Sequence, residues 1–105
     1  MDTELLLLAK RALNITWDEA ETDLRLTDIL EDAVPALRFK LGAPEEFDFS
    51  APSPARKLLL AYCRYEYNGM AELFDDAYAQ DLMTARMAFL LDTDWAKQEG
   101  SANDG

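Results

Sequence analysis

The chain contains no histidine and a single cysteine, and these two scarcities exclude much of the chemistry that proteins perform. Histidine is the commonest general base and metal ligand, so catalytic triads and cysteine–histidine zinc sites are excluded. One cysteine cannot form an internal disulfide. Cys63 falls among apolar residues in the middle of a predicted helix. We therefore interpret Cys63 as a small buried hydrophobic residue rather than a nucleophile.

Glycine is scarce as well, because the chain has four glycines and they are scattered. No phosphate-binding glycine-rich loop and no Asp-x-Asp-x-Asp-Gly calcium loop occur in the sequence. Carboxylates are numerous, and pairs such as Asp75–Asp76 and Glu31–Asp32 are interpreted as solvated faces. We expect no enzymatic activity, no metal site and no cofactor.

Basic residues are outnumbered, with 10 Lys and Arg against 21 Asp and Glu, and the net charge is −11. Such a chain is repelled by a phosphate backbone, so we expect no sequence-specific binding of DNA or RNA. Two explanations of the acidity stay open. It can serve solubility, or it can line a passage through which DNA slides without sticking.

Long apolar runs are also missing, so we expect no contact with a membrane. The run Leu5–Leu8 follows acidic residues rather than a basic segment, and we expect no signal peptide there. A chain of 105 residues that is 50% hydrophobic fits one small domain. We assign residues 1–92 to a single helical domain and residues 93–105 to a flexible acidic tail.

The stretch 54–69 has the signals of a helix around which the rest is organised. Ser53 can cap its start, Pro54 suits its first position, and Asn68-Gly69 can end it. Apolar residues cover most of its circumference, and such a helix is buried on more than one side. We expect either a central helix of the domain or one that is shared with another subunit.

Three further helices are predicted from apolar spacing, which gives an all-α bundle of about four helices. A first helix ends near Leu13, and Thr16–Glu19 then resembles a capping box. A second helix spans about 21–41, with Pro35 inside it. A proline inside a helix costs about 3 kcal/mol, so we expect a kink near Leu30–Glu31 or a break.

The remaining predicted elements are a loop and a last helix. The loop, residues 43–52, is rich in proline and acid, and Phe47 and Phe49 make either a short extended piece or two anchors to the core. The last helix runs from Met70 or Ala71 to Leu91.

Apolar residues at outward positions are candidate partner contacts. The outward apolar residue of the second helix is Phe39, and those of the last helix are Met83, Met87 and Leu90. The alternative is that they are incidental, since single apolar residues are common on surfaces.

Two carboxylates fall inside apolar patterns. Glu66 lies between the apolar arcs of the central helix, and Asp81 lies in the apolar stripe of the last helix. A buried carboxylate needs a partner, which can be an arginine, a tyrosine hydroxyl or a backbone N–H, within the chain or across a subunit boundary. The alternative is that they lie at the stripe's edge and reach water. The candidate arginines are Arg25, Arg38, Arg56, Arg64 and Arg86.

The segment Tyr65-Glu66-Tyr67-Asn68-Gly69, followed by Phe74, Tyr78, Asp81-Leu82 and Arg86, resembles the small head–tail connector proteins of tailed bacteriophages and prophages. These are also called adaptor or head-completion proteins. A short first helix, the Asn-Ile-Thr break at 14–16 and a long second helix are similar too. The resemblance covers about residues 3–91, while Pro35 and the loop with Phe47 and Phe49 depart from it.

The resemblance implies an all-helical structural protein that assembles as a ring, commonly twelve-fold, below the portal protein. Such a ring extends the DNA channel and docks the next connector, stopper or tail protein. It would assemble in the host bacterial cytoplasm and reside at the head–tail junction of the virion. An acidic helical protein-binding module or DNA mimic is the alternative. A small magnesium-dependent enzyme fits the sequence less well.

Overall fold

The computed structural model describes residues 3–91, and within that range every regular element is a helix. The all-α prediction is therefore confirmed. Asp92 and the predicted tail at 93–105 lie outside the described residues. In chain order the elements are α1 (Thr3–Ala12), α2 (Ala20–Leu41), α3 (Pro54–Tyr67), the short 3-10 helix η1 (Ala71–Leu73), α4 (Phe74–Ala77) and α5 (Ala79–Leu91).

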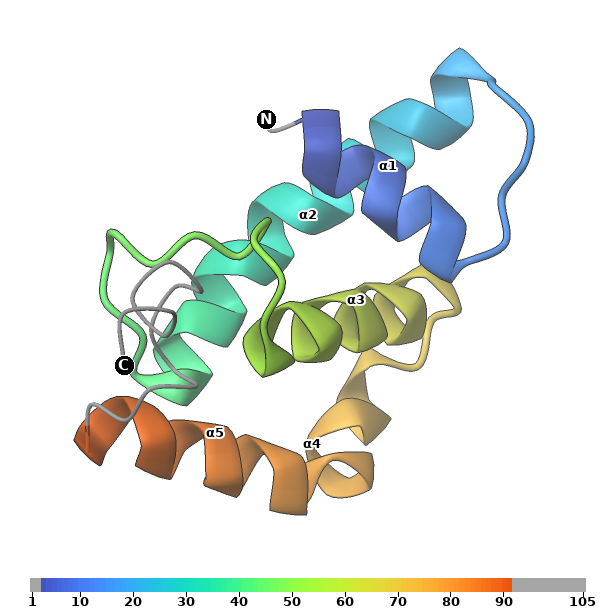
Figure 1. The fold of residues 1–105 in the computed structure, drawn as a ribbon. Coiled ribbons are helices and arrows are strands. Elements are labelled where there is room, and N and C mark those ends of the chain that lie inside the picture. The colour runs from blue at the N-terminus through green and yellow to red at the C-terminus, as the bar shows by residue number, and fades with distance from the viewer. Residues whose placement is uncertain (1–2, 92–105) are drawn as a thin grey trace.

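Helix α3 contacts α1, α2, η1 and α5, while α2 also contacts α1 and α5. In Figure 1, α1 and the start of α2 lie at the top of the molecule, α3 crosses the middle and α5 lies at the bottom. One hydrophobic core joins these helices. Its fully buried large side chains are Leu30, Leu37, Leu41, Leu59, Cys63 and Phe74.

Both predicted ends of α3 are confirmed. The Arg56 amide donates to the Ser53 hydroxyl at 3.1 Å, and Pro54 occupies the first turn. At the other end Gly69 adopts a φ of +71°, which glycine accepts without strain. This turn lets the Met70 amide donate to the Tyr65 carbonyl at 2.8 Å.

Helix α2 continues past Pro35, so of the two predicted alternatives, a kink near Leu30–Glu31 or a break, the break is wrong. The pyrrolidine ring is exposed, while Leu30, Ala33 and Leu37 on the opposite side are fully buried. Proline removes one hydrogen bond, to the carbonyl of Glu31, and that residue is exposed to water. Packing of the inner face therefore holds the helix together across the proline.

The predicted capping box at Thr16–Glu19 is wrong. Helix α2 begins at Ala20, and Glu19 is its N-cap without a side-chain capping bond. Instead, the Thr22 hydroxyl donates to the Glu19 carboxylate at 2.8 Å. The preceding turn contains Asn14 with a φ of +60° and the buried Ile15, so Thr16 lies outside the helix.

The last predicted helix is divided at Tyr78, where φ is −115°. Backbone hydrogen bonds continue through the division, but α4 and α5 point in different directions (Figure 1). Phe74 is fully buried, stacks on Tyr78 with 4.8 Å between ring centroids, and also contacts the Tyr62 and Tyr65 rings of α3. This aromatic cluster holds α4 against α3, and α5 then crosses beneath.

Two phenylalanines anchor the loop before α3 to the core. Of the two predicted alternatives, an extended piece or two anchors, the second is therefore confirmed. Phe47 and Phe49 are buried and pack edge to face at 5.0 Å, and Phe47 also meets Phe89 of α5 at 4.9 Å. The Arg38 guanidinium donates to the Phe47 carbonyl and lies over the Phe49 ring. The loop therefore closes one end of the core.

Candidate interaction surfaces

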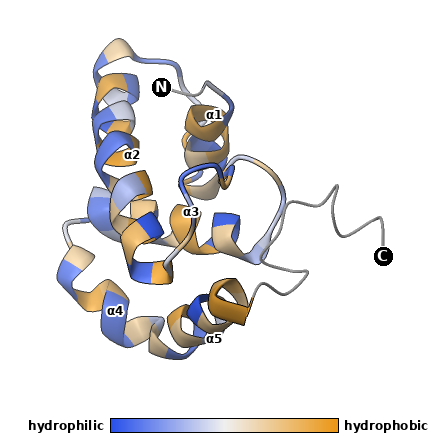
Figure 2. Cartoon of the chain, turned by 90° about the vertical axis from the view of Figure 1, so that its left-hand side faces the viewer, coloured by the Kyte–Doolittle hydropathy of each residue, from blue (hydrophilic) through white to orange (hydrophobic). Residues whose placement is uncertain are grey.

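Helix α5 is apolar on two opposite faces. Its inner face contributes the small buried residues Ala85 and Ala88. Its outer face carries Met83, Met87 and Leu90, which are 65%, 48% and 75% exposed. Figure 2 shows hydrophobic residues around the end of α5. Helix α5 therefore presents apolar side chains both to the core and to solvent.

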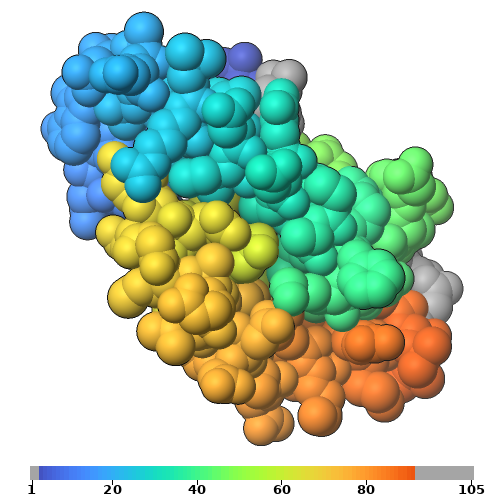
Figure 3. All heavy atoms as spheres, turned by 180° about the vertical axis from the view of Figure 1, so that it is seen from behind, coloured from blue at the N-terminus to red at the C-terminus, as the bar shows by residue number. Residues whose placement is uncertain are grey.

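Phe39, at the end of α2, is 86% exposed and lies beside this face. It lines a groove of about 470 Å³ together with Met83 and Arg86 of α5. The Lys40–Asp75 ion pair, at 3.1 Å, lies in the same groove. In Figure 3 the end of α2 (green) borders α5 (orange). The structure thus brings together Phe39 and Met83, which the sequence suggested separately.

We call the set Phe39, Met83, Met87 and Leu90 the outer α5 surface. The structure shows that all four side chains are exposed. Their role as partner contacts stays a prediction.

Glu66 is half-buried and lies one helical turn after Tyr62 in α3. Burial, followed by the negative charge of Glu66, raises the pKa of the Tyr62 hydroxyl. The two alternatives for Glu66, a partnered carboxylate or one that reaches water, both stay predictions.

Asp81 is exposed, so the alternative in which it is buried inside this chain is wrong. It lies on the edge of α5 that faces α3, where it can reach water. Arg64 and Arg86 line different grooves, and the structure does not bring them together.

The other candidate arginines are engaged with backbone carbonyls. Arg25 donates to the Tyr67 carbonyl at 2.8 Å and its guanidinium lies over the Tyr67 ring at 4.4 Å. Arg56 donates to the Ser50 carbonyl at 3.1 Å, and Arg38 holds the loop described above. These arginines stabilise loop and helix ends rather than the two carboxylates.

A second groove, of about 460 Å³, runs between α3 and α5. Its floor includes Leu58 and Ala61, and Lys57 and Arg64 stand on the α3 side. Sequence analysis missed this groove. A signal was present, since Lys57 and Arg64 are seven residues apart and therefore share one face of a helix. The position of Asp81 of α5 beside them could not be predicted from the sequence.

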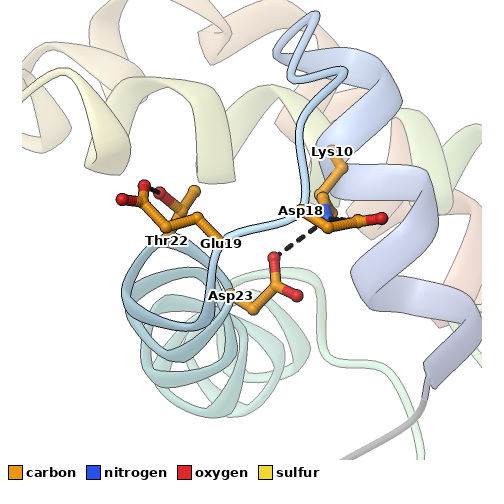
Figure 4. A network of polar contacts seen from close by, with 5 residues as sticks. All are labelled: Lys10, Asp18, Glu19, Thr22 and Asp23. Atoms are coloured by element: carbon orange, nitrogen blue, oxygen red, sulfur yellow. Dashed lines mark hydrogen bonds and ion pairs between the residues drawn. The ribbon is translucent and has the colours of Figure 1, made fainter.

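Sequence analysis also missed a buried lysine. The side chain of Lys10 is 8% exposed, and its Nζ lies 2.8 Å from Asp18 and 2.9 Å from Asp23. Figure 4 shows these groups coming from α1, from the following loop and from α2. The hydrogen bond to Asp18 is the largest cause of the raised pKa of Lys10, and Lys10 in turn lowers the pKa of Asp18. The cluster fixes α1 against the start of α2.

Within residues 3–91, no group of three or more potential ligands is placed to hold a metal ion. None of the described helices is both long and apolar enough to cross a membrane. Comparison of the chain with protein-family models, with curated proteins and with solved structures finds no match.

Proposed function

We propose that the chain is a structural subunit of a head–tail connector ring of a tailed bacteriophage or prophage. The ring sits below the portal, extends the DNA channel and docks the next connector or tail protein. The sequence resemblance supports this proposal, and the observation that carries it is the outer α5 surface. Helix α5 exposes the large apolar side chains of Met83, Met87 and Leu90 on one face, and exposed apolar patches of this kind mark interaction sites.

The outer α5 surface is suited to a contact that forms only in an assembly. Burying a large apolar side chain contributes about 1.5–3 kcal/mol. Association costs on the order of 4–15 kcal/mol, so four side chains per subunit make a weak single contact. A ring of such subunits, commonly twelve in the proteins that the chain resembles, presents that contact many times to one portal and gains affinity from multivalency.

The other features fit the same proposal. A net charge of −11 disfavours adhesion of DNA to the channel wall. Helix α3 contacts α1, α2 and α5, as the proposed central helix of a ring subunit would. No step of the proposed function requires a catalytic group.

A second candidate is an acidic module that binds a basic protein surface, such as that of a nucleic-acid-binding protein. Exposed Glu31 and Asp32 on the outer side of α2 favour this candidate. Its binding would weaken steeply with salt, whereas an apolar contact through α5 would persist.

The test is capture of the chain by the portal protein of the same phage, in low and high salt. The double variant Phe39→Ser with Leu90→Ser should lose capture. Leu7→Ser with Leu73→Ser is the control, because these leucines are large exposed apolar residues too, at 52% and 49%, but lie outside the outer α5 surface. Wild-type chain that does not bind the portal, or a control that loses binding equally, would contradict the proposal.

A further inference from the structure

The groove between α3 and α5 has cations on one side and an apolar floor. Lys57 and Arg64 are both exposed and lie seven residues apart on α3, which is about 10 Å along a helix. The floor includes Leu58 and Ala61. On the α5 side stands Asp81, so the two sides of the groove differ in charge. In a chain of net charge −11 this concentration of positive charge is unusual.

A matching surface exists on the first half of α2. Glu21, Leu24 and Asp28 are exposed on one face of that helix, and Leu24 is 63% exposed. Glu21 and Asp28 are also seven residues apart, so their carboxylates have about the same 10 Å spacing as the two cations. On α2, the apolar Leu24 side chain therefore lies between two negative charges. This pattern is complementary to the groove, where two positive charges flank an apolar floor.

We propose that the groove between α3 and α5 binds the first half of α2 from a second copy of this chain. Leu24 enters the apolar floor, and Glu21 and Asp28 pair with Lys57 and Arg64. Asp81 repels carboxylates, so it fixes the side of the groove on which the acidic residues lie. The inference deepens the proposed function, on which it rests, by naming the contact between neighbouring subunits of the ring.

The arrangement of the two surfaces agrees with a ring. The start of α2 lies at the top of the molecule and α5 at the bottom (Figure 1). A contact between two different surfaces joins subunits head to tail, and it gives a closed ring when the rotation closes. The outer α5 surface takes no part in it and stays available for the portal.

The experiment is sedimentation velocity over a concentration series, with charge-reversal variants. Variant K57E/R64E makes the groove negative, and variant E21K/D28K makes the α2 face positive. Each variant alone opposes like charges, so we expect its self-association to weaken about tenfold or more. In an equimolar mixture every contact between the two variants again joins opposite charges, and we expect association through these mixed contacts to return to near the wild-type level.

Variant E45K/E46K is the matched control for E21K/D28K, because both variants replace two carboxylates by lysines and so change the net charge equally. It changes two exposed loop residues outside both surfaces, and its self-association should stay within about twofold of the wild type. Circular dichroism checks that each variant is folded, which is expected because all the substituted residues are exposed.

Three results would overturn the inference: no recovery in the mixture, equal weakening in the control, or a wild-type chain that is monomeric at its highest soluble concentration. Portal capture by the wild type and by K57E/R64E is measured separately. If the portal does not capture the wild type, the proposed function is contradicted. Charge-dependent self-association supports the contact between the groove and α2 of a second copy, whatever the portal result.

Discussion

Helices α2 and α5 both carry many apolar residues, but they distribute them in opposite ways. Helix α2 buries Leu26, Leu30, Leu37 and Leu41, together with Ala33, on one face. Helix α5 buries only Ala85 and Ala88 completely, and turns its methionines outward. Large apolar residues in contact with water contribute nothing to folding. The comparison shows that the face of α2 from Leu26 to Leu41 is covered within the chain, whereas the outer face of α5 is not, and this difference supports the proposal that a partner covers α5.

The largest expected difference between the interior and the outer α5 surface is in thiol reactivity. Cys63 is fully buried, and burial raises the pKa of its thiol to about 12. Native Cys63 should therefore react with a thiol reagent at least on the order of a thousand times more slowly than in the unfolded chain. In the variant M87C the new thiol should react at once, while Cys63 stays protected. Comparable rates for both thiols would show that the two regions do not differ.

Truncation of side chains should separate the same two regions by stability. Leu37→Ala leaves a cavity under α2 and should reduce the free energy of unfolding by about 2–5 kcal/mol. Met87→Ala removes an exposed side chain and should change it by less than about 0.5 kcal/mol. Urea denaturation followed by circular dichroism measures both values. A loss above about 2 kcal/mol for Met87→Ala would mean that the outer face is already covered within the chain.

A smaller loss of unfolding free energy than for Leu37→Ala is expected for Lys10→Met, because this change leaves the half-buried Asp23 carboxylate without its cation. Because the pKa of Lys10 is raised in the folded chain, its stabilising effect is complete below pH 10.5, the ordinary lysine pKa, and disappears as the pH rises through the folded value. Tyr62 and Cys63 also have raised pKa values and add to the alkaline loss. Lys10→Met should therefore show a shallower decline of stability than wild type at high pH.

Thermal unfolding between pH 8 and pH 11 measures this decline. The double variant Lys10→Met with Asp23→Asn is the control, since it removes the unpaired carboxylate and should recover part of the stability. An identical decline in wild type and Lys10→Met would contradict a stabilising role of the Lys10 cluster.

The smallest effect is expected in the loop before α3. The Asp48 carboxylate accepts hydrogen bonds from the Ser50 hydroxyl at 2.7 Å and from its amide at 2.9 Å, and these bonds lower the pKa of Asp48. The ionised Asp48 carboxylate therefore stabilises the folded chain above the ordinary aspartate pKa of about 4. This stabilisation is lost as the pH falls through the lower pKa that Asp48 has in the folded chain. Asp48→Asn should reduce the acid dependence of the melting temperature slightly, and Ser50→Ala should do so less. If the acid dependence of the melting temperature is unchanged in both variants, the hydrogen bonds of Asp48 do not stabilise the fold.

The elements that sequence analysis predicted well depend on local signals. Ser53, Pro54 and Gly69 mark the ends of α3, and Gly42 ends α2 with a φ of +68°, because capping involves only neighbouring residues. The division at Tyr78 was missed because it depends on where the Phe74 ring packs against α3, which is a contact between distant segments. Lys10 was missed for the same reason, since Asp18 and Asp23 reach it only after the chain turns.

The outward position of Met83, Met87 and Leu90 follows from the period of a helix, so it could be predicted. The groove with Lys57 and Arg64 could not, because it exists only where α5 crosses α3. Asp81 illustrates the limit. A helical pattern placed it inside an apolar stripe, whereas the angle of α5 puts it at the edge of that stripe, in water.

The most direct test of the central claim uses the triple variant Met83→Ser, Met87→Ser and Leu90→Ser. The account predicts that its free energy of unfolding stays within about 1 kcal/mol of wild type, because the three side chains are exposed, while capture by the portal is lost. A loss of stability similar to that of Leu37→Ala, or full capture by the portal, would contradict the claim that the outer α5 surface awaits a partner.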